Sequence, residues 1–308
     1  PAGSPPVGIV PLMHRHFVEP TDALTATHIR HGSGVPLTQL PPTAKAVFFG
    51  ASYHADYATI LCAPADLSAV AEAIADELAH PDPDADHPAP WDAVDMRRLR
   101  CGDPAADALA AAFARREMAE GWTVNLERED VCPVVTLPAG VDFDGFLATL
   151  GKKERHEIRR KVRRAEAAGV VRLVDSDDPR ADLDAFIELH QKRWGAEGLF
   201  PSTPGGNASR ANFHRLFDLL DDGMIRLSFL EVGGRRISAG VWLEEGDVAY
   251  YYNAGVDPAA RELSPGVVMV ARFAERAIVE GKRRLDFLRG DEPYKYEWGA
   301  IDEPIVRL

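Results

Sequence analysis

The stretch from residue 225 to residue 254 constrains the fold of this chain more than any other feature. Residues 225–232, 236–244 and 248–254 alternate apolar and polar side chains, and two Gly-containing turns (GGR and EEGD) join them. Alternation over short runs with glycine at the joints is typical of antiparallel strands linked as hairpins. The stretch therefore predicts a three-stranded antiparallel meander.

Helices and further strands are expected on both sides of the meander. Apolar spacing of three and four, together with breaks at Gly151 and Gly169, predicts the helices. The expected helices are at residues 142–168, as one long helix or two in sequence, and at 183–194, 212–220 and 265–280. The expected strands are at 170–174 and 284–288. The Pro- and Gly-rich segment 199–209 between two of these helices is expected to be a mobile loop.

The first half of the chain repeats this alternation in a looser form. Strands are expected at residues 7–13, 47–50, 57–62, 91–99 and 122–126, helices at 66–80 and 103–120, a polar loop at 82–90 and a crossing between the halves at 132–138. A length of 308 residues also favours two domains. We therefore expect a mixed α+β protein (α/β class) with two similar folds in tandem, each a mostly antiparallel mixed sheet flanked by helices.

The two expected domains are residues 1–138, a degenerate copy, and residues 139–308, which carry the site. The chain begins without Met on a Pro- and Gly-rich stretch, which leaves open that the first domain is truncated at its start. No run of about 18 apolar residues and no basic-then-apolar leader pattern occurs, so we expect a soluble, cytoplasmic protein without a membrane span.

The charge and cysteine content exclude several classes of protein. A net charge of −13 argues against a general nucleic-acid binder, which needs a basic surface to neutralise phosphates. Cys62, Cys101 and Cys132 are odd in number and widely spaced, so neither a disulfide framework nor a zinc site is expected. We expect all three to be buried thiols.

The start of the helix expected at 265–280 is the first candidate for a ligand site. Ser264 is a favoured N-cap residue, Pro265 suits the first helical position, and Gly266 leaves the end of the helix open to close approach. Free backbone N–H groups at such a start attract phosphate or pyrophosphate. The alternative is a well-capped helix with no ligand.

These residues resemble the GNAT acyltransferases, in which a loop of pattern Arg/Gln-x-x-Gly-x-Gly/Ala holds the pyrophosphate of coenzyme A. The run RELSPG at 261–266 fits this pattern, with Ser264 at the first glycine position and Pro265 lacking one amide donor. The resemblance implies that the loop binds acetyl-CoA or another acyl-CoA. The residues that it assigns to the donor are Arg261, Leu263, Ser264, Gly266 and Val267.

Further stretches resemble the CelD/BcsL-like branch of the GNAT acyltransferases, which is related to the Fem-type transferases that add amino acids to peptidoglycan precursors. They are LATLGKKER at 147–155, RRK at 159–161, residues 186–194, LSPG at 263–266 and DFLRGDEPYK at 286–295. The last is the most specific. The resemblance covers roughly residues 140–300 and implies no metal.

The segment after the strand at 284–288 crowds titratable groups together, as acid and base catalysis requires. Acyl transfer from a thioester to an amine needs a base, donors for the oxyanion and an acid for the leaving thiolate. We assign the base to Asp291 or Glu292, and thiolate protonation or oxyanion support to Tyr294 or Lys295. In the alternative interpretation Arg289 and Asp291 form an ion pair that fixes the turn, while Tyr294 and Trp298 cap the core.

Two other groups of residues are candidates for substrate binding. Residues 152–164 (KKERHEIRRKVRR) carry eight Lys or Arg against two Glu, and form either a solvated helix face or a surface for a phosphorylated ligand. His190 and Trp194 lie four apart on one helical face, so they either pack in the core or line an acceptor pocket closed by the following loop. Tyr251 and Arg289 are further candidates for acceptor contact.

The sequence therefore favours an N- or O-acyltransferase that moves an acyl group from acyl-CoA to an amine or hydroxyl of a small-molecule, sugar or cell-envelope acceptor. Two alternatives remain open. One is Fem-type transfer from aminoacyl-tRNA, which the basic helix favours. The other is a non-catalytic sensor or scaffold that binds acyl-CoA without turnover.

Overall fold

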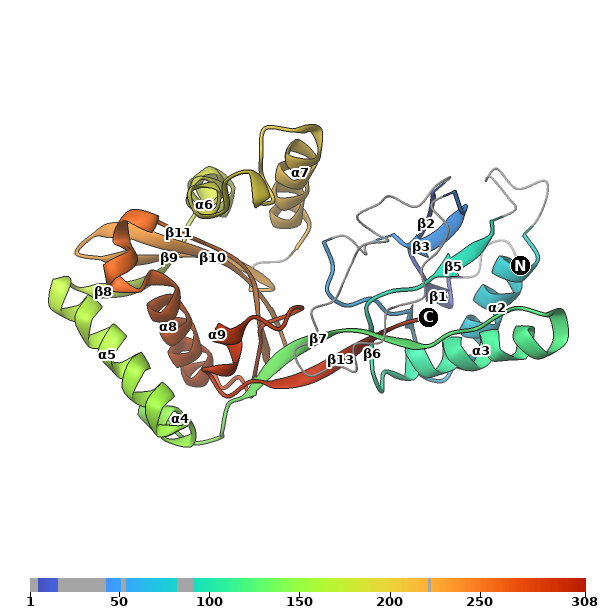
Figure 1. Cartoon of the computed structure of the whole chain (residues 1–308), viewed down its shortest axis with the longest axis horizontal. Helices are drawn as coiled ribbons and strands as arrows, with labels where there is room; N and C mark the ends of the chain where they lie inside the picture. Colours follow the sequence, from blue (N-terminus) through green and yellow to red (C-terminus); the bar gives the residue numbers. More distant parts are fainter. Residues whose placement is uncertain (1–4, 16–42, 51–53, 82–90, 221–222) are drawn as a thin grey trace. The chain divides into compact units, whose positions relative to one another are not determined.

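The computed structural model describes residues 5–15, 43–50, 54–81, 91–220 and 223–308 (Figure 1). The loop expected at residues 82–90 lies outside this set. The chain forms two compact units: the first contains Pro1–Cys132, Arg289–Asp291 and Asp302–Leu308, and the second contains Pro133–Leu288 and Glu292–Ile301. The domain boundary expected at 138/139 and the tandem arrangement stay predictions.

A mixed sheet forms the centre of the second unit. The expected meander is present, because β10 pairs antiparallel with both β9 and β11. Its strands are β8 (Val171–Asp175), β9 (Ile225–Val232), β10 (Arg235–Glu245), β11 (Val248–Val256), β12 (Arg284–Asp286) and the end of β7 (Glu127–Thr136). Their order is β7-β12-β11-β10-β9-β8, and only the β11–β12 pair is parallel. The expected mixed α/β class is confirmed.

Helices cover both faces of this sheet (Figure 1). On one face lie α4 (Phe143–Thr149), α5 (Lys152–Ala168) and α8 (Pro265–Val279); on the other lie α6 (Pro179–Trp194) and α7 (Pro204–Leu219). A hydrophobic core lies on each face of the sheet, one under α6 and α7 (the α6/α7 core) and one under α5 and α8 (the α5/α8 core). Side chains of β9 point alternately to the two faces, so Leu227 and Phe229 lie in the α6/α7 core and Leu230 lies in the α5/α8 core. The remaining helical turns of this unit are η1 (Gly195–Glu197), η2 (Pro258–Leu263) and α9 (Pro293–Tyr296).

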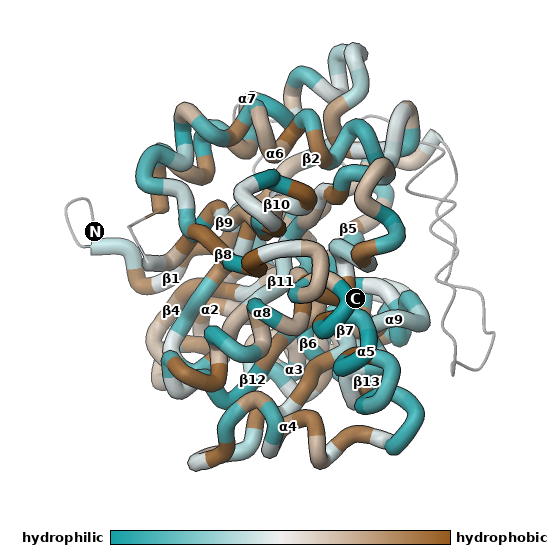
Figure 2. The backbone as a smooth tube through the Cα atoms, turned by 90° about the vertical axis from the view of Figure 1, so that its left-hand side faces the viewer, coloured by the Kyte–Doolittle hydropathy of each residue, from teal (hydrophilic) through white to brown (hydrophobic). Residues whose placement is uncertain are grey.

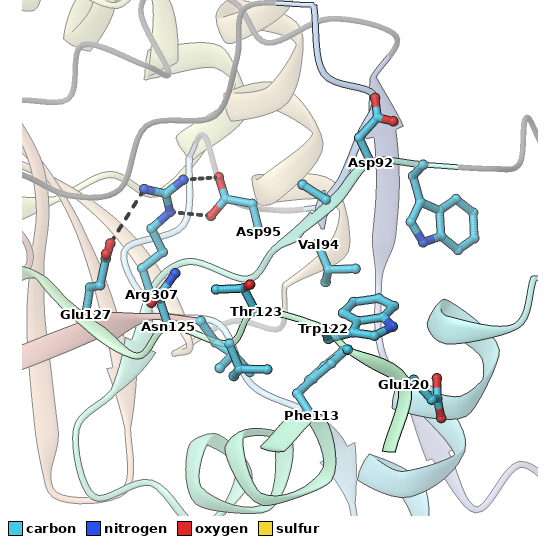
Figure 3. A pocket seen from close by; sticks show the side chains of 15 residues that line it. Asp92, Val94, Asp95, Phe113, Glu120, Trp122, Thr123, Asn125, Glu127 and Arg307 are labelled. Atoms are coloured by element: carbon cyan, nitrogen blue, oxygen red, sulfur yellow. Dashed lines mark hydrogen bonds and ion pairs between the residues drawn. The ribbon is translucent and has the colours of Figure 1, made fainter. Parts of the chain in front are cut away.

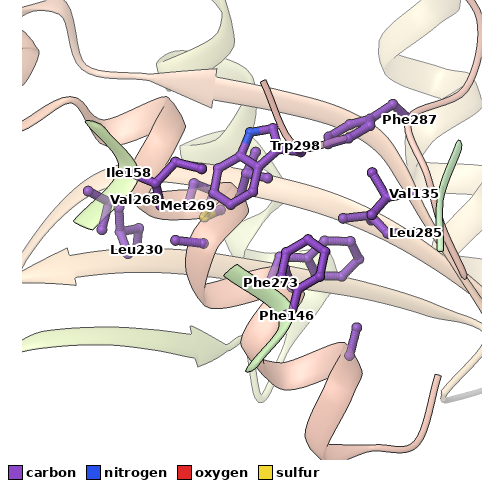
Figure 4. Packing of buried hydrophobic residues seen from close by; sticks show 14 of the residues in the cluster. Val135, Phe146, Ile158, Leu230, Val268, Met269, Phe273, Leu285, Phe287 and Trp298 are labelled. Atoms are coloured by element: carbon purple, nitrogen blue, oxygen red, sulfur yellow. The ribbon is translucent and has the colours of Figure 1, made fainter. Parts of the chain in front are cut away.

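The α5/α8 core is built around large aromatic side chains. The indole of Trp242 stacks on the ring of Phe273, with centroids 3.8 Å apart, and both side chains are buried. Figure 4 shows that Phe273 of α8 lies near Phe146 of α4 and the buried Trp298 in this core. This core holds α8, the helix with the expected ligand-binding start, firmly against the sheet.

The prediction of a loop at residues 199–209 is wrong over its second half, which is helical. Helix α7 already begins at Pro204, because the Thr203 side chain accepts a hydrogen bond from the Gly206 N–H and Pro204 fits the first helical position. Gly206 lies inside the first turn, where a Cβ would come within 1.9 Å of the Pro201 carbonyl oxygen. Close packing thus explains the glycine that composition alone made typical of a mobile loop.

The first unit has smaller sheets and two helices. A sheet of order β2-β3-β5 contains β2 (Leu12–Arg15), β3 (Ala46–Phe49) and β5 (Ala93–Asp95). The other elements are β1 (Gly8–Ile9), β4 (Leu61–Cys62), α2 (Leu67–Ala79), β6 (Leu99–Arg100), α3 (Pro104–Glu120) and β13 (Ile301–Arg307). Strand β1 pairs with β4, and β13 lies between β6 and β7.

Three expectations for the first half are wrong. The strand expected at 122–126 begins instead at Glu127 with the charged run ERED, because buried Glu129 forms an ion pair with buried Arg98. The strand expected at 57–62 shrinks to Leu61–Cys62. Of the cysteines only Cys132 is buried, whereas Cys101 is exposed.

No helix within the described residues is long and apolar enough to cross a bilayer.

We predict that Gly255→Ala destabilises the second unit by about 2 kcal/mol or more, because overpacking against rigid backbone strains the fold. A Cβ at Gly255 of β11 would lie 2.4 Å from the backbone nitrogen of His190 in α6. Gly266→Ala is the matched control, since a Cβ there meets nothing within 4 Å. Denaturant unfolding measures both variants, and equal stability of the two would contradict the prediction.

Candidate functional site

Strands β11 and β12 part after three residue pairs. They pair in parallel from Val248–Arg284 to Tyr250–Asp286. Beyond this point β11 stays with β10, because Tyr251 pairs with Trp242. The other strand follows β7, where the Phe287 N–H donates to the Pro133 carbonyl oxygen at 3.0 Å. The sheet therefore opens beside Tyr251 and Phe287.

The chain leaves β11 through η2 and enters α8 at Ser264. Ser264 is the N-cap residue, as expected, with φ 52° and ψ 54°, but its side chain makes no capping hydrogen bond. Pro265 has no N–H, and the N–H groups of Val267 and Val268 already donate to the Ser264 carbonyl oxygen. Among the described residues the Gly266 N–H has no acceptor, and the space beside Gly266 is open.

The other residues expected at the donor loop surround this opening. Leu263 and Val267 are half-buried and pack against the α5/α8 core, whereas Arg261 is exposed. The structure therefore brings all five expected donor residues together at one helix start. That these residues bind acyl-CoA stays a prediction.

The basic helix α5 supplies a cation to the same place. The Arg164 guanidinium donates from Nη2 to Ser264 Oγ at 2.6 Å. Two other arginines of α5 form ion pairs, Arg159 with Asp144 at 2.7 Å and Arg160 with Glu157 at 2.8 Å. Arg164 has no acidic partner within the described part of the chain, so its charge is not neutralised. Sequence reasoning found the helix but not this residue.

Helix α9 positions three of the four residues assigned to catalysis or support. Lys295 is buried; its Nζ donates to the Leu288 carbonyl oxygen at 3.1 Å and pairs with the exposed Glu292 at 2.9 Å. Lys295 thus ties α9 to the end of the strand. The Tyr294 ring lies edge-on to Phe287, with centroids 5.9 Å apart, and the residue is 40% exposed.

Tyr294 and Tyr251 form one electrostatic group. Burial is the main cause that raises the pKa of the Tyr294 phenol, and Tyr251 and Glu292 raise it further. Burial also raises the pKa of the Tyr251 phenol, whose ring packs against Trp242 and Phe287. Both phenols therefore keep their protons at neutral pH and can donate hydrogen bonds.

Arg193 at the end of α6 is a residue that sequence reasoning missed. Its charge acts on both phenols and lowers their pKa values against the effect of burial. The guanidinium carbon lies 4.9 Å from the ring centroid of Trp194, which is exposed. The only signal in the sequence is its place between His190 and Trp194.

His190 is a core residue. It is 3% exposed, and its ring lies 4.9 Å from that of Phe200 and 6.3 Å from that of Trp194. Burial lowers the pKa of His190 from 6.5 to about 4, against a raising effect of Gln191. The imidazole is neutral at physiological pH. Acceptor binding by His190, Trp194 and Tyr251 stays a prediction.

Arg289 and Asp291 lie in the first unit. The Arg289 guanidinium pairs with Asp56 at 3.2 Å and with Asp130 at 3.7 Å. Burial is the main cause that raises the pKa of Asp130, and the charge of Asp291 raises it further. The structure thus assigns the tail run to two units, with Glu292, Tyr294 and Lys295 in the second.

We predict that stability falls on acidification because of His190. Its folded pKa lies below that of the unfolded chain, so unfolding takes up a proton between about pH 6.5 and pH 4, with a loss on the order of 2 kcal/mol. His190→Leu removes this part of the pH dependence, whereas His156→Ala at an exposed site keeps it. Urea unfolding from pH 7 to pH 4 measures the difference, and equal pH profiles for wild type and His190→Leu would contradict the prediction.

Comparisons with known proteins agree with this architecture. Residues 152–296 match the family model described as an acetyltransferase (GNAT) domain. This segment contains α5, the meander, α8 and α9, which together hold the parted strands and the open helix start. No curated protein sequence matches the chain.

Two solved structures with TM-scores above 0.5 share the fold at low sequence identity. The C-terminal domain of a putative lysylphosphatidylglycerol synthetase from Agrobacterium fabrum has a TM-score of 0.54 and 9% identity, over 85% of this chain and 76% of that one. A conserved protein of unknown function from Bacteroides thetaiotaomicron has a TM-score of 0.51 and 14% identity, over 85% and 78%. The crystal structure of FemX aligns with a TM-score of 0.49 and 13% identity, over 70% of this chain and 71% of that one.

The match over residues 152–296 identifies this segment as a GNAT acetyltransferase domain, which supports a transferase enzyme.

Proposed function

We propose that the second unit transfers an acyl group, in the first instance acetyl, from acyl-CoA to an amine or hydroxyl of a small-molecule, sugar or cell-envelope acceptor. The observation that carries the proposal is the open start of α8, where the Gly266 N–H is free beside the guanidinium of Arg164. A partial positive charge and an unpaired cation at one point favour a diphosphate group.

Helix α5 adds to the attraction of a phosphorylated donor. Lys152, Lys153 and Arg163 have no acidic partner among the described residues, and hydrophilic residues run along this helix (Figure 2). In a chain of net charge −13 these cations make the local potential positive where the rest of the surface repels phosphate. They therefore support the 3'-phosphate and diphosphate of coenzyme A as the groups recognised here.

The proposed chemistry uses the groups beside the parted strands. The thioester supplies the acyl group and a thiolate leaving group. Tyr294 keeps its proton at neutral pH, so we assign it protonation of the departing sulfur. Glu292 remains a candidate base for the acceptor amine, and Asp291 of the first unit remains the other. Lys295 is held by Leu288 and Glu292, which supports a role in placing α9 and leaves its oxyanion role as a prediction.

A second candidate is Fem-type transfer from aminoacyl-tRNA. The third is a non-catalytic sensor or scaffold that binds acyl-CoA without turnover. The unpaired cations of α5 favour the tRNA candidate, because neutralising phosphates releases counterions and makes binding strongly salt-dependent. The Agrobacterium neighbour is named a putative lysylphosphatidylglycerol synthetase, but its likeness to this chain shows the fold alone. A salt titration of tRNA binding separates this candidate from an acyl-CoA enzyme.

We predict that Gly266→Glu weakens acetyl-CoA binding about 100-fold, because it puts a carboxylate where the diphosphate would lie. Stability is retained, since the side chain enters open space and acids suit a helix start. Arg164→Ala weakens binding about tenfold, whereas Arg215→Ala, at an exposed unpaired arginine of α7, does not. Calorimetric titration measures all three, and wild-type affinity in both Gly266→Glu and Arg164→Ala would contradict the donor site.

We also predict that Tyr294→Phe lowers the transfer rate about 100-fold while acetyl-CoA affinity stays unchanged, because the phenol donates its proton only during reaction. Thiol release from acetyl-CoA with a panel of amines and alcohols measures the rate. Tyr296→Phe on the same short helix is the control. An unchanged rate in Tyr294→Phe would remove it from the mechanism, and binding without turnover in the wild type would favour the sensor.

A further inference from the structure

The first unit contains a cavity that the proposed acyl transfer does not use. Its volume is about 650 Å³, against about 440 Å³ for a second cavity beside Trp298 in the second unit. It lies between β5 and the extended segment that precedes β7 (Figure 3). Small-molecule sites usually measure about 300–1,000 Å³, so the cavity is large enough for a small ligand.

Aromatic rings line one side of this cavity. Phe113 and Trp122 lie with ring centroids 5.8 Å apart. The Trp91 indole N–H donates to the Leu78 carbonyl oxygen at 2.8 Å, which fixes that ring in place. Flat, rigid aromatic faces bind the apolar side of a sugar or an organic cation at little entropic cost.

Polar groups without partners project from the next residues of the wall. Within the described ranges, no hydrogen-bond partner is found for the indole N–H of Trp122 or for the side chains of Thr123 and Asn125. Figure 3 shows these three side chains, from one extended segment, among those that line the cavity. They offer a bound molecule both hydrogen-bond donors and acceptors.

The charge of the lining is acidic. Four carboxylates and one guanidinium line the cavity: Asp92, Asp95, Glu120, Glu127 and Arg307. Arg307 is taken up by buried Asp95, with Nε 2.6 Å from Oδ1. Asp92 lines the cavity and is exposed; it accepts the backbone N–H of Lys45 at 2.9 Å, and no ion pair to its carboxylate is found among the described residues.

We propose that this cavity binds a small organic amine in its protonated form, with the ammonium group near Asp92 and the rest of the molecule against Trp122. Aromatic faces and carboxylates both attract an ammonium group, whereas they repel phosphates and carboxylates. Thr123 and Asn125 then contact hydroxyl or amide groups of the ligand. The inference is independent of the acyl-CoA proposal, because it concerns only residues of the first unit.

Calorimetric titration of the whole chain with glucosamine and with cadaverine tests the proposal, and N-acetylglucosamine serves as the uncharged counterpart of the first. We expect saturable binding of at least one amine, no binding of N-acetylglucosamine at the same concentrations, and weaker binding at high salt. Binding of glucosamine alone would assign the site to hydroxylated amines, and binding of cadaverine alone to aliphatic ones.

Two variants locate the binding. Asp92→Asn should weaken the amine about tenfold, and Trp122→Leu should do the same through lost ring contact, whereas Asp184→Asn, at an exposed acid of α6, should change nothing. Asp92 is exposed, so its variant keeps the fold even if Trp122→Leu does not. Lack of saturable binding by both amines, equal affinity for N-acetylglucosamine, or wild-type affinity in Asp92→Asn would overturn the proposal.

Discussion

The account of the second unit depends on the parting of β11 from β12. Three parallel residue pairs hold the two strands together, and then each strand takes its hydrogen bonds from a different neighbour. Backbone groups in a sheet must be satisfied, so a gap of this kind persists only because β10 and β7 supply partners on either side. Tyr251 and Phe287 stand at the gap, and Tyr294 packs on Phe287. The proposed site therefore rests on a backbone feature before any side chain contributes.

Charge placement adds the second constraint. The protein is acidic as a whole, yet α5 carries eight cations in thirteen residues, and one of them reaches the start of α8. Most cations elsewhere in the second unit are used in ion pairs, for example Arg276 with Asp175 at 2.6 Å and Arg236 with Asp182 at 2.9 Å. In the proposed function the unpaired ones recognise phosphate. The acidic cavity of the first unit has the opposite preference, which supports two ligands of opposite charge.

Local pattern was enough to predict the meander, α5, α6 and α8, because period and turn residues act over a few positions. It failed where distant segments decide the structure. Strand β13 was missed because its partners, such as Leu99 and Arg100, lie about two hundred residues away. The start of β7 was missed because the charge of buried Glu129 is neutralised by an ion pair with the distant Arg98. The helix predicted for α7 was too short because the glycines of its first turn are typical of loops.

The candidate site also has parts that local sequence predicted and parts that it did not. The donor loop could be predicted as one contiguous run with helix-start chemistry, and the structure keeps it together. The tail run DFLRGDEPYK could not be apportioned from sequence, because its residues belong to two units and Lys295 turns inward. Arg164 and Arg193 could not be singled out, since nothing local distinguishes them from neighbouring cations.

The most direct test of the account is hydrogen–deuterium exchange of the whole chain with and without acetyl-CoA. If the diphosphate binds at the open end of α8, the Gly266 amide and its neighbours in residues 261–268 gain protection, while α7 does not change. Protection elsewhere with no change at 261–268 would contradict the assignment of this helix start as the donor site.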